Sequence, residues 1–93
     1  MKVSVMYPKT EGASFDMEYY KTKHFEIVDR TMKPTRWEID AGVNGPYEVV
    51  ANLYFDSKDA MDAGMAQAAE AGADVPNFTT IKSVVQVAEI VEV

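Results

Sequence analysis

The 93-residue sequence contains no cysteine and only one histidine, His24. Without thiols the chain can form no disulfide, thiolate nucleophile, iron–sulfur cluster or cysteine-based zinc site. A single histidine also excludes the metal-binding motifs that take two histidines from one chain. The five glycines form no phosphate-binding pattern, and 93 residues leave no room for a nicotinamide or flavin domain beside the core. We therefore expect no metal site and no bound cofactor.

Basic residues and long apolar runs are also scarce. Nine lysines and arginines face fifteen acidic residues, so the formal net charge is −6 and a nucleic-acid surface is not expected. No apolar run approaches the roughly 20 residues that span a bilayer. The N-terminal MKVSVMYP is too brief for a signal peptide and has the pattern of a strand. These features predict a cytoplasmic protein with neither nucleic acid nor membrane as a partner.

Hydrophobic residues make up 47% of the sequence, which favours a folded domain over disorder. No linker or repeat is visible, and we expect a single domain over residues 1–93. A chain this short buries only about 60% of the surface that its unfolded form exposes, so dimerisation would stabilise it.

Periodic patterns predict six elements in the order β-α-β-β-α-β. Asp16 is a candidate N-cap of the first helix, Asp56 or Ser57 of the second, and Gly72 is expected to end the second helix in a left-handed turn. The expected strands cover residues 2–7, 36–42, 47–55 and 81–93, and the expected helices run from 16 to about 31 and from 58 to about 71.

This order predicts an α+β, ferredoxin-like fold with two helices on one face of a four-stranded antiparallel sheet. The expected strands 47–55 and 81–93 carry apolar residues on both faces, whereas a sheet with one wet face should alternate cleanly. We therefore expect a second copy of the chain to cover the open face, giving a homodimer.

The segment FDMEYYKTKH, residues 15–24, contains the candidate catalytic residues. Tyr20 and His24 are four apart, so a helix places them side by side, while Tyr19 points to another face. His24 is a candidate general acid or base, because imidazole exchanges protons near neutral pH. Tyr20 could donate a hydrogen bond to a carbonyl oxygen or to the imidazole. The alternative is ordinary packing, with Phe15 and Tyr20 forming a hydrophobic staple.

Asn52 is an amide within an otherwise apolar strand, and a buried amide needs hydrogen-bond partners. It is a candidate for binding a substrate carbonyl, although it could equally hold a dimer interface or face trapped water. Tyr54, Trp37 and Met6 are predicted to form walls of the same substrate site. Gln86 is as ambiguous as Asn52.

Five segments resemble the EthD family, whose name refers to ethyl tert-butyl ether degradation. They are VSVMYP, FDMEYYKTKHFEIV, LYFDSKDA, DVPNFT and QVAEIVEV, and the most recognisable pattern is D-x-x-Y-Y-x-x-x-H, formed by Asp16, Tyr19, Tyr20 and His24. The resemblance implies the dimeric α+β-barrel fold and a ligand pocket between the first helix and the sheet. It implies oxidoreductase, oxygenase or isomerase activity in a catabolic pathway only loosely, because members of this superfamily differ in chemistry.

The sequence thus favours a homodimeric EthD-like protein that binds a small apolar or aromatic carbonyl compound. His24 and Tyr20 could act on that compound by cofactor-independent proton transfer or oxygenation. Two alternatives remain open: a non-catalytic carrier that serves an oxygenase, and a purely structural subunit.

Overall fold

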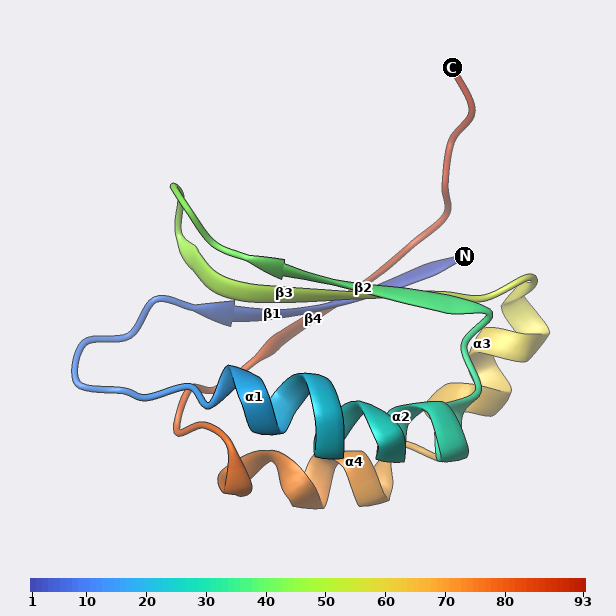
Figure 1. Ribbon diagram of the computed structural model, residues 1–93. Coiled ribbons are helices and arrows are strands. Elements are labelled where there is room, and N and C mark those ends of the chain that lie inside the picture. Colours follow the sequence, from blue (N-terminus) through green and yellow to red (C-terminus); the bar gives the residue numbers. More distant parts are fainter.

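The computed structural model describes residues 1–93 and consists of one four-stranded antiparallel sheet with all of its helices on one face (Figure 1). The strand order is β2-β3-β1-β4, so the first strand of the chain lies inside the sheet. This confirms the predicted ferredoxin-like α+β fold. The strands are β1 (Lys2–Pro8), β2 (Arg36–Ala41), β3 (Tyr47–Tyr54) and β4 (Val84–Ala88).

The first helical segment starts and ends close to the predicted positions. It consists of α1 (Met17–Tyr19), a π-helical turn η1 (Tyr20–His24) and α2 (Phe25–Met32). The carboxylate of Asp16 caps its start by accepting a 3.0 Å hydrogen bond from the Tyr19 amide, as predicted. After Met32, Lys33 adopts a left-handed conformation with φ 55°, and Pro34 prevents continuation.

The second helical segment differs from the prediction of one helix ended by Gly72. Ser57 caps α3 (Lys58–Met65), a tight turn follows, and α4 (Ala69–Asp74) leads into the short 3₁₀ helix η2 (Val75–Asn77). Gly72 lies inside α4 and is not among the residues with positive φ, so it is not the C-cap. The break falls in an alanine-rich stretch, where no residue type marks a helix end. It redirects the chain, so that α3 and α4 both contact α2.

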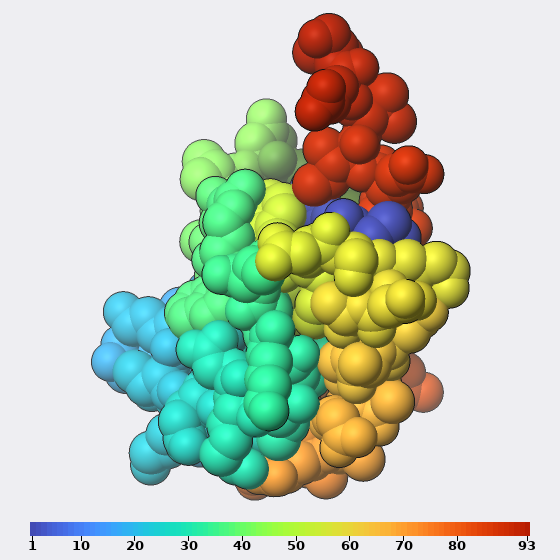
Figure 2. All heavy atoms as spheres, turned by 90° about the vertical axis from the view of Figure 1, so that its right-hand side faces the viewer, coloured from blue at the N-terminus to red at the C-terminus, as the bar shows by residue number.

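The last strand is much shorter than the predicted 81–93. Ala88 pairs with Lys2, next to the start of the chain, so β1 offers no further partner beyond that point. The remaining residues leave the sheet and stand clear of the body (Figures 1 and 2). Ile90 and Val91 are therefore 56% and 79% exposed.

The hydrophobic core lies between the sheet and the helices. Fourteen buried apolar residues form it, and alternate positions of β1 and β3 supply its floor. The intervening positions, among them Ser4, Met6, Val50 and Asn52, point to the opposite face, which no helix covers (Figure 1). No helix in the structure combines the length and apolar character needed to cross a membrane.

Gly64 permits close packing of α3 on the rest of the core. A Cβ atom built there would lie 2.7 Å from the Met32 carbonyl oxygen and 2.8 Å from the Phe55 ring. Gly64→Ala should therefore lower the free energy of unfolding by about 1–3 kcal/mol in urea titrations. At Gly72 an added Cβ meets nothing within 4 Å. Gly72→Ala should keep or raise stability, and equal losses in both variants would contradict this packing.

Candidate functional site

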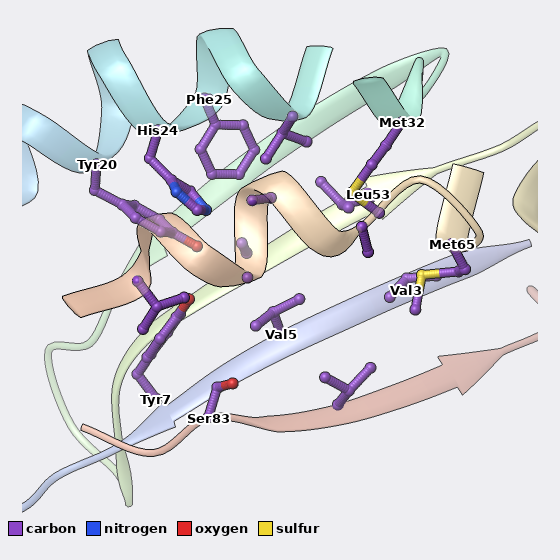
Figure 3. Close-up of a pocket in the computed structure, with 17 residues that line it drawn as sticks. Val3, Val5, Tyr7, Tyr20, His24, Phe25, Met32, Leu53, Met65 and Ser83 are labelled. Atoms are coloured by element: carbon purple, nitrogen blue, oxygen red, sulfur yellow. The ribbon is translucent and has the colours of Figure 1, made fainter. Parts of the chain in front are cut away.

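A cavity of about 170 Å³ lies between the sheet and the helices (Figure 3). Its walls are mainly aliphatic and aromatic, and the polar groups that reach it come from Tyr7, Tyr20, His24 and Ser83. A dry apolar cavity of about 150 Å³ is known to bind benzene. The volume therefore matches a molecule the size of one six-membered ring.

His24 is fixed in this wall by a carboxylate distant in the sequence. Its side chain is buried, and Nδ1 lies 3.0 Å from Oδ2 of Asp74 at the end of α4. An ionised carboxylate only accepts hydrogen bonds, so Nδ1 carries the hydrogen and Nε2 keeps its lone pair. The hydrogen bond to Asp74 is the one that the imidazole makes within the chain, so Nε2 is left open where the ring lines the cavity. This arrangement leaves a basic nitrogen available to a ligand.

Asp74 is held ionised by three hydrogen bonds. Besides His24, its carboxylate accepts from the Tyr19 hydroxyl at 2.7 Å and from the Asn77 amide at 2.9 Å. Burial by itself would raise the pKa of Asp74, but hydrogen bonds from Tyr19, Asn77 and His24 outweigh it and the pKa is lowered. For His24, burial lowers the pKa, and the neighbouring Asp74 raises it by a smaller amount, so the net pKa is lowered. The imidazole is thus a neutral base near pH 7.

The π-helical turn places Tyr19 and His24 on the same carboxylate. In η1 the Phe25 amide donates to the Tyr20 carbonyl oxygen, five residues back. Such a turn spans one residue more than an α-helical turn, and π turns often occur at functional sites. Residues five apart are thereby brought to one side. Tyr19 does not line the cavity that Tyr20 and His24 line, in agreement with its predicted separate face, but its hydroxyl reaches the same carboxylate as His24.

Tyr20 packs directly on the imidazole, as its spacing predicts. The two rings stack with centroids 5.1 Å apart and planes 11° from parallel. Burial, followed by the adjacent Tyr7 hydroxyl, raises the pKa of Tyr20 far above its ordinary value, so its hydroxyl stays protonated. Phe15 also contacts Tyr20 edge-on at 4.9 Å. Tyr20 therefore packs against Phe15, as the hydrophobic staple predicts, and also lines the cavity beside His24.

The four predicted wall residues do not line the cavity. Asn52, Tyr54 and Met6 point to the open face of the sheet, away from the helices. Trp37 faces the helices, but its ring packs on Phe25, with centroids 4.3 Å apart, and its indole N–H donates to the Asp29 carboxylate of α2. Their part in substrate binding stays a prediction, and the position of this cavity gives it no support.

Asn52 is instead satisfied by neighbouring strands. Its carbonyl oxygen accepts from the Ser4 hydroxyl and its amide donates to Asp40, both at 2.9 Å. Tyr54 donates to Glu38 at 2.8 Å, and the Arg36 guanidinium lies 3.8 Å from its ring centroid. These contacts tie together β1, β2 and β3 on the open face.

Sequence reasoning missed four members of the site. Asp74 holds His24, Tyr19 and Asn77 hold Asp74, and Tyr7 was expected only to be a strand residue. The one local signal was an acidic residue directly before the VPN turn. Fifty residues separate Asp74 from His24, so no helical or strand periodicity connects them.

The state of His24 can be measured directly, because its ring signals are the only histidine signals in a proton spectrum. We expect a folded-state pKa below 6.5, the ordinary value, and a still lower one in Asp74→Asn. A lowered pKa means that the unfolded chain binds the proton first. Stability should therefore fall as the pH drops below about 6.5 and level off below the folded pKa. His24→Gln should abolish that decline, and a wild-type pKa above 6.5 would contradict the assignment.

Comparison with known proteins shows the family of the chain. No protein-family model matches the sequence, and no protein of curated function matches it. A crystal structure of an EthD-like protein from Ralstonia eutropha is 33% identical, with a TM-score of 0.87 over 98% of this chain and 91% of the other. An EthD family protein from Bacillus halodurans is 15% identical (TM-score 0.67, 95% and 97% covered), and HapK from Hahella chejuensis is 13% identical (0.58, 100% and 99%). These two share the fold alone. The identity and coverage of the Ralstonia protein show that the chain belongs to the EthD-like family.

Proposed function

We propose that this EthD-like protein binds a small apolar or aromatic carbonyl compound in the cavity and transfers a proton through His24, without a cofactor. The observation that carries the proposal is the orientation of the imidazole. Its Nδ1 is held by Asp74, while its Nε2 has no partner in the chain and the ring borders an apolar cavity. A neutral imidazole held in this way is a suitable general base near pH 7.

The surroundings of His24 support a neutral, compact ligand. No lysine or arginine lines the cavity, so a carboxylate or phosphate would lose its hydration without gaining a counter-ion. The aliphatic walls favour a hydrocarbon body, and the few polar groups lie on the side formed by Tyr7, Tyr20 and His24 (Figure 3). Oxygenation would begin with the same proton abstraction, since a carbanion can then react with dioxygen.

The test compares His24→Gln with the parent protein, using cyclohexanone and acetophenone as probes. Binding is followed by amide chemical shifts, and proton transfer by exchange of the hydrogens beside the carbonyl in D₂O. We expect His24→Gln to retain binding but to lose about 10²–10⁴-fold in the enzyme-dependent exchange rate. Glu26→Gln changes an exposed residue of the same helix and is the matched control, which should keep the exchange rate of the parent protein.

An exchange rate that does not change in His24→Gln would end the catalytic proposal. Binding by the parent protein without any exchange would favour a non-catalytic carrier that delivers the ligand to another enzyme.

We also propose that the protein is a homodimer that buries the open face of the sheet. Met6 and Val50 are half-buried neighbours on that face, and Val84 extends the apolar surface onto β4. The Ser4–Asn52–Asp40 hydrogen bonds satisfy the Ser4 hydroxyl and the Asn52 side chain, so the face can pack against a second copy without leaving the Asn52 amide unpaired.

Val50→Lys should dissociate this dimer, because it places a charge within an apolar interface. Sedimentation velocity at low micromolar concentration should give a dimer for the parent and a monomer for the variant. Val85→Lys is the matched control, since Val85 lies on the helix side of β4 and should leave the dimer intact. A monomeric parent protein at that concentration would contradict the proposal.

A further inference from the structure

Three polar groups without an anchoring partner elsewhere in the chain meet at one end of the cavity. They are the hydroxyls of Tyr7 and Tyr20 and Nε2 of His24 (Figure 3). Tyr7 and Tyr20 are 2% and 1% exposed, and their ring centroids lie 5.7 Å apart. No fully buried side-chain nitrogen or oxygen lacks a partner, so these groups pair with one another or are open to the cavity, where a ligand's polar atom can meet them.

The three groups are complementary in their hydrogen-bonding roles. The two hydroxyls point toward each other (Figure 3), so when Tyr20 donates to Tyr7 the proton of Tyr7 remains for a ligand. Both hydroxyls stay protonated near neutral pH, because burial raises the pKa of each. Nε2 of His24 offers only a lone pair. The site therefore presents a donor and a base next to each other in an apolar cavity.

We propose that the cavity takes an enolisable ketone with a body about the size of one ring, and that Tyr7 is the hydrogen-bond donor to its carbonyl oxygen. This assignment rests on the proposed function of His24. A ketone oxygen accepts but does not donate, which matches the free proton of the tyrosine pair. The acidic carbon is bonded directly to the carbonyl carbon, so an oxygen held by Tyr7 keeps that carbon at the His24 side of the cavity.

The reaction step needs no external oxidant or reductant. Nε2 of His24 takes a proton from the carbon beside the carbonyl, and the pair from the broken C–H bond forms a C=C bond. The π electrons of the carbonyl move onto its oxygen, and this enolate oxygen is held by the tyrosine hydroxyls. The proton on Nε2 then exchanges with solvent or stays in place. Its return to the same carbon after solvent exchange gives hydrogen–deuterium exchange, its delivery to the oxygen gives the enol, and its delivery to another carbon gives an isomer.

The experiment uses cyclohexanone labelled with ¹³C at the carbonyl and compares the parent, Tyr7→Phe and Tyr47→Phe. Tyr47 is half-buried at the start of β3 and does not line the cavity, so it is the matched control. In the parent, infrared difference spectra should show the bound carbonyl stretch at a lower frequency than in hexane. Tyr7→Phe should move it back toward the hexane value and slow exchange by about 10²-fold, with less effect on affinity.

The outcomes separate this inference from the function on which it rests. A Tyr7→Phe variant with an unchanged carbonyl frequency and exchange rate would overturn the role of Tyr7 and leave His24 as the base. An exchange rate insensitive to His24→Gln would instead overturn the proposed function. Absence of cyclohexanone binding by the parent would overturn the assignment of the ligand. If Tyr7→Phe does not fold, Tyr20→Phe tests the same hydroxyl pair and should shift the carbonyl frequency in the same direction.

Discussion

The carboxylate of Asp74 is the group on which the organisation of the site depends. It stands at the end of α4 and accepts hydrogen bonds from Tyr19, His24 and Asn77, so it ties the first helical segment to the second. A buried charge is stable only when it is well hydrogen-bonded, and these three donors satisfy that requirement. The same bonds select the tautomer of His24 and orient its ring. Positioning of a basic imidazole by a carboxylate is a recurring feature of sites that move protons.

Departures from ideal packing are concentrated around this carboxylate. The π turn, the buried imidazole and the two buried tyrosine hydroxyls lie at one end of the helix–sheet interface, and the cavity extends from them toward Met32 and Met65. The remainder of the core is ordinary, with aliphatic residues of β1 and β3 packed under α2. A chain of 93 residues has little stability in reserve, so a cavity and a buried carboxylate are costly features to retain. Natural proteins accept such costs mainly at functional sites.

The EthD-like family assignment and the proposed chemistry have different foundations. The family follows from likeness to a solved structure at 33% identity along nearly the whole chain. The fold extends to proteins at 13–15% identity, where likeness of the backbone says nothing about the reaction. The proposed chemistry rests on Tyr7, Tyr20, His24 and Asp74 alone. The proposed chemistry therefore depends on the geometry of these four residues, and membership of the family does not support it independently.

Local sequence determined the features that depend on near neighbours. Alternation located all four strands, Asp16 and the Ser57 alternative located the helix starts, and the four-residue spacing placed Tyr20 on His24. Tertiary structure decided the rest. The length of β4 depends on where β1 begins, because a strand needs a partner. Asn52 lies on the sheet face opposite the cavity. The sequence could not predict this, because strands that are apolar on both sides do not reveal which face the helices cover. Asp74 reaches His24 across fifty residues because packing of α4 beside α2 brings together groups that no sequence periodicity connects.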